Sequence, residues 1–113
     1  MNAYAIPGIV KYEKDLKKCL KEAGISISEL SDKTRKREIA ECRQAIMAFA
    51  ITDFGYTQEK AARMFMLNHA TANHSRNKIH EEMYLRSKHP NMQISKGLEL
   101  YLKLVEIKNN KTP

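Results

Sequence analysis

Residues 55–79, GYTQEKAARMFMLNHATANHSRNKI, decide the fold that the sequence predicts. Thr57 is a suitable N-cap for a short helix that is expected to end at Phe65, because its hydroxyl can accept a hydrogen bond from the first turn. After an abrupt turn at Met66-Leu67, Asn68 is a suitable N-cap for a second helix. Two helices joined in this way, with the second opening on polar side chains, predict a helix-turn-helix.

The second of these helices is expected to run from Asn68 to Arg86 or Ser87 and to have an inner and an outer face. At about 100° per residue, its inward stripe consists of Ala72, Ser75 or Arg76, Ile79 and Met83. The side chains that point away from this stripe are Ala70, Asn73, His74 and Asn77, flanked by Thr71 and Lys78. His69 lies nearer the core, but from the first turn it can still reach past the helix end. The outer face is therefore rich in hydrogen-bonding side chains.

The rest of the chain predicts more helices and no strands, so the expected fold class is all-α, a compact domain of about five to six helices. The expected segments are a helix from Ile9 to Gly24, a single turn capped by Ser28 and containing Leu30, a helix at about 34–54 with Thr34 as N-cap and Gly55 at its end, and a helix from Ile94 or Ser95 to Ile107. A chain of 113 residues fits one domain. Loose ends are expected at 1–8, ending in Pro7-Gly8, and at 109–113.

Apolar residues at spacings of three and four predict the core. The first helix contributes Ile9, Tyr12, Leu16, Cys19 or Leu20, and Ala23, and the long helix contributes Ile39, Cys42, Ile46 and Phe49. Because Cys19 and Cys42 fall on these stripes and form no CxxC pair, we expect two buried, reduced thiols in a cytoplasmic protein. No signal segment opens the chain, and no apolar run approaches the ~18 residues that span a bilayer.

The formal net charge of +7, from 20 Lys and Arg against 13 Asp and Glu, favours a polyanionic partner. We expect neither an enzyme nor a cofactor nor a small-molecule substrate. No nucleophile beside a base, no carboxylate pair and no phosphate-binding glycine loop is apparent. His69, His74 and His80 do not share one helical face with a carboxylate or a Cys, so a metal site is not expected. The six Met residues, including Met47, Met64 and Met83, are interpreted as core filler.

The C-terminal helix carries apolar residues on two faces. Leu98, Tyr101, Leu102 and Val105 form one face, which is expected to pack on the domain. Leu100, Leu104 and Ile107 form a second face, and its sequence leaves two interpretations open. It belongs to the core, or it is a contact for a homo-oligomer or a replication partner.

Three segments, TRKREIAECRQAIMAFA at 34–50, GYTQEKAARMF at 55–65 and NHATANHSRNKI at 68–79, together resemble the C-terminal DNA-binding domain (domain IV) of the bacterial replication initiator family, DnaA. The resemblance extends over roughly 9–83. Its strongest matches are the residues 35–39, Arg43-Gln44, His69, Thr71, His74 and Lys78-Ile79. It implies an all-α domain with a helix-turn-helix and a preceding basic loop, which binds duplex DNA on the nucleoid in the cytoplasm.

The resemblance also implies a role for the matching residues. Arg35 would enter the minor groove, a narrow and negative site that suits a guanidinium. Backbone phosphates would lie along Lys33, Arg37, Arg43 and Gln44, and further along the second helix at His74 and Lys78. Major-groove base edges would be read by Asn68, His69, Ala70 and Thr71. The expected DNA-binding set is completed by Lys36 and Asn73.

This sequence departs from the family pattern at several positions of the helix-turn-helix. Asn68 stands where Asp is common, Ala70 where a Thr is common, and Glu59 where a Pro is common. Ala72-Asn73 replace a Val-Leu pair, and the turn is one residue shorter. These changes suggest a diverged, stand-alone relative. Two hypotheses follow: a sequence-preferring DNA-binding protein acting in replication initiation or its regulation, or a protein-interaction or oligomerisation module with only weak DNA binding. RNA is a weaker third partner, because a helix cannot read the deep, narrow major groove of A-form RNA.

Overall fold

The computed structural model describes residues 7–31 and 37–110, and within them the chain forms six α-helices and no strand. The helices are α1 (Pro7–Glu22), α2 (Ile27–Leu30), α3 (Arg37–Phe54), α4 (Gln58–Arg63), α5 (His69–Lys88) and α6 (Lys96–Asn110). The all-α prediction is therefore confirmed. None of the described helices is long and apolar enough to cross a membrane.

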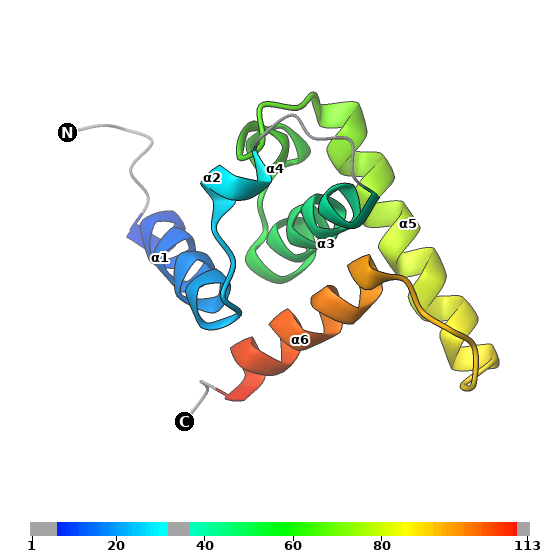
Figure 1. The fold of residues 1–113 in the computed structure, drawn as a ribbon. Coiled ribbons are helices and arrows are strands. Elements are labelled where there is room, and N and C mark those ends of the chain that lie inside the picture. Colours follow the sequence, from blue (N-terminus) through cyan, green and yellow to red (C-terminus); the bar gives the residue numbers. More distant parts are fainter. Residues whose placement is uncertain (1–6, 32–36, 111–113) are drawn as a thin grey trace.

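Helix α3 lies at the centre of the molecule, with α5 and α6 against it and α1, α2 and α4 around it (Figure 1). Every residue from Ala45 to Ala50 is buried, which a helix shows only when it is covered on all sides. The predicted stripe is correct at Ile46 and Phe49. It is wrong at Ile39 and Cys42, which are only half-buried, whereas Glu41 beside them is buried under the start of α6.

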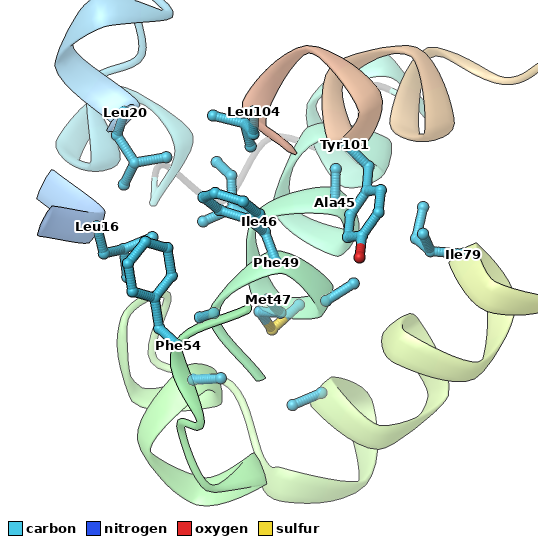
Figure 2. Packing of buried hydrophobic residues seen from close by; sticks show 14 of the residues in the cluster. Leu16, Leu20, Ala45, Ile46, Met47, Phe49, Phe54, Ile79, Tyr101 and Leu104 are labelled. Carbon is cyan, nitrogen blue, oxygen red and sulfur yellow. The ribbon is translucent and has the colours of Figure 1, made fainter. Parts of the chain in front are cut away.

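Aromatic rings join the elements that meet on α3. Figure 2 shows Phe49 at the middle of the cluster, with Leu16 and Leu20 of α1 on one side and Tyr101 of α6 on the other. The Phe49 ring centroid lies 5.2 Å from that of Phe54 and 6.3 Å from that of Tyr101, and both pairs are edge-to-face. This arrangement suits the ring quadrupoles and fixes α6 across the central helix.

The two cysteines differ in their surroundings. Cys19 is 2 % exposed, as predicted, whereas Cys42 is half-buried, and neither forms a disulfide. Partial burial raises the pKa of the Cys42 thiol, and the nearby carboxylates of Glu41 and Glu38 raise this pKa further. A raised pKa lowers the fraction of thiolate, which is the reactive species, at neutral pH.

Several predicted helix ends differ from the observed ones. Helix α1 begins at Pro7, not after Pro7-Gly8, because proline lacks an N–H and its fixed φ suits the first helical position. Helix α6 continues to Asn110, so the predicted loose end at 109–113 is wrong for its first two residues. Thr34, the predicted N-cap of α3, lies outside the described residues.

The C-terminal helix uses both of its apolar faces in the core. Leu98, Tyr101 and Leu104 are at most 3 % exposed, while Leu100, Leu102, Val105 and Ile107 are partly buried against the same cluster. The second predicted face is therefore core, because Leu104 at 0 % exposure cannot contact another molecule.

The methionines are less uniform than predicted. Met47 is buried, but Met66 is 87 % and Met83 36 % exposed.

Two carboxylates lock the start of α6 onto α3 and α5. Glu82 of α5 accepts hydrogen bonds from the Ser95 backbone N and from the Ser95 Oγ, both at 2.6 Å. The Glu41 carboxylate of α3 accepts one from the Lys96 backbone N at 3.1 Å. Gly97 allows this approach, because a Cβ there would lie 3.0 Å from the Glu41 carbonyl oxygen. This junction holds α5 at a fixed angle to the rest of the domain.

Candidate DNA-binding surface

The helix-turn-helix predicted at 55–79 is formed by α4 and α5. The Thr57 hydroxyl caps α4 by accepting a hydrogen bond from the Lys60 N at 3.1 Å. Helix α4 ends at Arg63, two residues before the predicted Phe65, and a turn follows at 64–66. The Leu67 N donates to the Ala62 carbonyl at 2.9 Å and closes this turn.

The turn contains a residue in the left-handed conformation. Met66 has φ 57°, and it is the only non-glycine residue with positive φ in the described segments. An L-residue in this region brings its Cβ close to the following carbonyl oxygen, so glycine is usually preferred there. The abrupt turn is thus made at the expense of local strain at Met66.

Small side chains let α4 and α5 approach each other closely. Ala61 and Ala62 of α4 and Ala72 of α5 are all 0 % exposed, and Phe65 fills the space beside them at 3 %. Side chains of this size permit a short distance between two helix axes. Ala72 stands where the family commonly has Val, and the contact between α4 and α5 is still closely packed at this position.

Asn68 is the N-cap of α5, as predicted. Its Oδ1 accepts two hydrogen bonds, from the Thr71 backbone N at 2.9 Å and from the Thr71 Oγ1 at 3.1 Å. Because the oxygen is used within the helix start, the amide nitrogen of Asn68 is the group left to meet a ligand. Asn68 therefore presents hydrogen-bond donors to its surroundings.

The outer face of α5 is largely free of protein contacts, as the sequence predicts. Among the predicted DNA-binding residues of this helix and its cap, those that are exposed are Asn68, His69, Ala70, His74 and Lys78. Thr71 is half-buried, and its hydroxyl is bonded to Asn68. Asn77, on the same face, is exposed as well.

Asn73 is the exception on this face. It is half-buried, and its Oδ1 accepts hydrogen bonds from Gln58 Nε2 at 3.0 Å and Arg76 Nη2 at 2.8 Å. The sequence places Asn73 away from the inward stripe, and the structure adds that its partner Gln58 holds the side chain toward α4. A direct DNA contact of Asn73 stays a prediction.

The basic segment ahead of α3 is only partly described. Lys33, Arg35 and Lys36 lie outside the described residues. The side chain of Arg37, which opens α3, is 90 % exposed and pairs with Glu41 at 3.2 Å.

The two other predicted phosphate contacts of α3 are less accessible. Arg43 is half-buried, and its Nη1 donates to the Leu30 carbonyl at 3.0 Å, which ties α3 to α2. Gln44 is half-buried. The sequence pattern did not indicate the structural contact of Arg43, because Leu30 lies thirteen residues away along the chain.

The structure brings two further polar residues to this surface, Gln58 and Arg76. The sequence left Ser75 or Arg76 open for the inward stripe and gave Gln58 no role, and the structure buries Ser75 there. Arg76 is in fact half-buried at the edge of that stripe, where its long side chain reaches outward to Asn73 and Asn77. The signal in the sequence was an arginine on an otherwise apolar stripe, since a guanidinium is almost never buried without partners.

The histidines form no metal site in the structure. No group of three or more His, Cys, Asp or Glu side chains suited to a metal ion occurs within residues 7–31 and 37–110. His80 instead lies 2.9 Å from the Thr52 hydroxyl through its Nε2 and packs edge-to-face on Tyr101. Its role is therefore to join α5 to α3 and α6.

Comparison with known proteins finds a family with this arrangement. The model of the bacterial DnaA protein helix-turn-helix matches residues 15–79. The chromosomal replication initiator protein DnaA of Pseudothermotoga lettingae is 38 % identical over 58 residues, which cover 51 % of this chain but 13 % of that protein. No solved structure matches the chain. Because the matched region spans more than half of the chain and the whole helix-turn-helix, the chain belongs to the family of bacterial DnaA helix-turn-helix domains, which are DNA-binding domains.

Proposed function

We propose that this protein binds double-stranded DNA with a sequence preference, as a replication initiator binds its recognition site, and acts in replication initiation or its regulation. The observation that carries the proposal is the exposed start of α5. Asn68, His69, Ala70 and His74 stand clear of the domain there. A helix presented in this way fits the major groove of B-DNA, where each base pair offers a distinct pattern of donors and acceptors. The proposed partner places the protein in the cytoplasm, on the nucleoid.

The proposed contacts divide into two classes. His74, Lys78 and Arg37 are exposed and polar or basic, and they would contact phosphates and set the register of the protein on the duplex. Asn68, with its donor-only presentation, and Ala70, with its methyl group, would contact base edges. Arg35 is assigned to the minor groove on the family resemblance alone.

Selection of bound duplexes from a random pool tests the proposal. We expect one preferred sequence to emerge, with an affinity that falls steeply between 50 and 200 mM salt, because binding releases counterions from the phosphates. If no sequence were enriched among the bound duplexes at physiological salt, the proposed sequence preference would be contradicted. Competition with unrelated duplex separates specific from non-specific binding.

A triple variant then tests the surface. Arg35→Ala, Arg37→Ala and Lys78→Ala together are expected to weaken binding to the preferred duplex by at least about 100-fold, because each cation contributes a charge-assisted contact. The matched control is Lys14→Ala, Lys17→Ala and Lys21→Ala, which removes the same charge from exposed positions of α1. Figure 1 shows α1 on the other side of α3 from α5, so this control should bind nearly as the wild type. Equal losses in the two variants would mean that net charge alone drives binding.

A second candidate function is a protein-interaction module with weak DNA binding. The face at Leu100, Leu104 and Ile107 no longer supports it, because that face is packed against the core. The distal half of α5 does support it, since Tyr84 is 62 % and Leu85 43 % exposed. Sedimentation of the protein alone, beside the duplex titration, distinguishes the two. Self-association together with sequence-blind binding would favour the interaction module.

A further inference from the structure

Arg76 is held in place by neutral side chains. Its Nη2 donates to the Oδ1 of Asn73 at 2.8 Å and to the Oδ1 of Asn77 at 3.2 Å, and its Nε donates to Asn77 at 3.4 Å. Asn73 is in turn fixed by Gln58 Nε2 of α4 at 3.0 Å. The guanidinium thus belongs to a network that joins the two helices of the helix-turn-helix, and its orientation is set before any ligand arrives.

This network orders the arginine without neutralising it. No carboxylate forms an ion pair with Arg76 in the part of the chain that the structure describes. A guanidinium has five N–H donors. The recorded bonds use Nε and Nη2, and the Nη1 amino group has no acceptor among the described residues. A preordered cation with unused donors is suited to bind an anion.

The surroundings of Arg76 are also suited to an anion. A shallow hollow of about 580 Å³ lies between α4 and α5, lined by Arg76, His69, Thr57, Gln58, Glu59, Tyr56 and Ile51. Glu59 contributes the one carboxylate in this lining, and it is engaged by Arg63 in an ion pair. The ring of Tyr56, which also lines the hollow, lies 4.6 Å from the Lys60 Nζ. Because Glu59 is engaged by Arg63, the charged group of the lining that keeps unused hydrogen-bond donors is the Arg76 guanidinium.

The position of the hollow indicates which anion it would meet. In a helix-turn-helix complex the second helix lies in the major groove, while the first crosses the sugar-phosphate backbone. The hollow lies between these helices and begins at His69, in the first turn of α5. The DNA strand that borders the major groove entered by α5 would therefore pass over this hollow.

We propose that Arg76 binds a backbone phosphate of the duplex, with Asn73 and Asn77 as its positioning residues. The proposal rests on the proposed function and names one contact of that surface. The two N–H groups of Nη1 remain to donate charge-assisted hydrogen bonds to phosphate oxygens, and the planar guanidinium fixes their direction more closely than a lysine ammonium would. In this view, the Asn73 that departs from the family's apolar pattern serves to present Arg76.

Arg76→Ala, measured on the duplex that wild-type protein selects, tests this assignment. We expect roughly tenfold weaker binding at about 0.1 M salt. The slope of log affinity against log salt should also be smaller in magnitude by about 1, the contribution of one phosphate contact. The selected base sequence should stay the same, because a phosphate contact carries no base information. Arg86→Ala is the matched control, since it removes the same charge from an exposed position on the same helix. It should change affinity less than about twofold.

Two further measurements separate phosphate binding from a purely structural role. Ethylation of single phosphates should reveal one phosphate whose modification weakens wild-type binding but not binding by Arg76→Ala. Arg76→Lys, which keeps the charge but loses the planar guanidinium that Asn73 and Asn77 orient, should bind between wild type and Arg76→Ala. An unchanged salt slope and ethylation pattern in a folded Arg76→Ala would overturn the assignment, as would an altered base preference.

Failure of the proposed function gives a different result. If the wild-type protein enriches no duplex, sequence-preferring binding fails, and the assignment of Arg76 fails with it. If the wild-type protein binds a preferred duplex and Arg76→Ala matches it in affinity, salt slope and ethylation pattern, only the assignment of Arg76 fails.

Discussion

Asn68 caps α5 through its oxygen, and we propose that its nitrogen has a separate task at the DNA surface. The oxygen accepts from the backbone and hydroxyl of Thr71 and so starts α5. The nitrogen can only donate, and it stays available at an exposed position. Donors pair in the major groove with the acceptors of guanine, adenine N7 or thymine O4, whereas an aspartate would pair with the cytosine amino group.

Asn68→Asp tests this separation of tasks. Asparagine and aspartate are about equally good N-caps, so we expect the unfolding free energy to change by less than about 0.5 kcal/mol. The base preference at one position should move toward cytosine, because the carboxylate accepts and does not donate. Parallel selections from a random duplex pool would measure this shift. Identical preferences for both proteins would mean that Asn68 only caps the helix.

At the scale of the element, the turn between α4 and α5 combines a short path with an unfavourable residue. Met66 is in the left-handed region with its side chain 87 % exposed, so few packing contacts offset the strain. Glycine would adopt this φ without a steric cost, as Gly24 and Gly55 do after α1 and α3. The strain is the physical consequence of making the turn without a glycine.

Met66→Gly is therefore expected to stabilise the protein by about 0.5–1 kcal/mol, the relief of the left-handed strain less the added entropy of the unfolded chain. Urea unfolding followed by circular dichroism measures the difference. Met66→Ala is the control, because it removes the exposed side chain but keeps the strained backbone, and it should change stability little. An equal gain from both variants would point to the side chain as the source.

At the scale of the whole molecule, α6 is attached to α3 at both of its ends. The Glu41 and Glu82 carboxylates hold its start. From the first half of α6, the Tyr101 hydroxyl donates to Asp53 Oδ1 at 3.1 Å, and near its end Lys108 Nζ donates to the Asp53 carbonyl at 2.9 Å. Burial, and then the charge and hydrogen bond of Asp53, raise the pKa of Tyr101 to about 12.

This raised pKa makes stability depend on alkaline pH. The folded state favours the neutral phenol, so the contribution is fully present below the unfolded pKa of about 10 and is lost as pH rises toward 12. We expect the unfolding free energy of the wild-type protein to decline over that interval. The unfolding free energy of the Tyr101→Phe variant should decline less. At neutral pH the Phe variant should be roughly 1 kcal/mol less stable, because the hydrogen bond to Asp53 is gone.

Urea unfolding at a series of pH values from 7 to 11.5 provides the measurement. Tyr84→Phe is the matched control, since it removes a phenol that is 62 % exposed, and it should follow the wild-type pH dependence. The attribution to Tyr101 would be wrong if Tyr101→Phe lost stability in parallel with the wild type as pH rises.

The candidate site could be predicted from the sequence only where local chemistry decides the outcome. The N-caps Thr57 and Asn68 were predicted correctly, because an N-cap bonds residues three positions away in the same chain segment. The exposure of Ala70, His74 and Lys78 followed from helical periodicity. The bonds from Gln58 and Arg76 to Asn73 could not be predicted, because they depend on how closely α4 approaches α5.

The sequence by itself determined the all-α class, the helix-turn-helix and the inner and outer faces of its second helix, because capping, periodicity and turn chemistry act over a few residues. Only the tertiary structure decided that α3 is buried on all sides at 45–50 and that both apolar faces of α6 belong to the core. It also decided that Arg76 lies beside the proposed DNA surface. These outcomes depend on contacts between residues far apart in the chain, and such contacts are set by packing of whole helices.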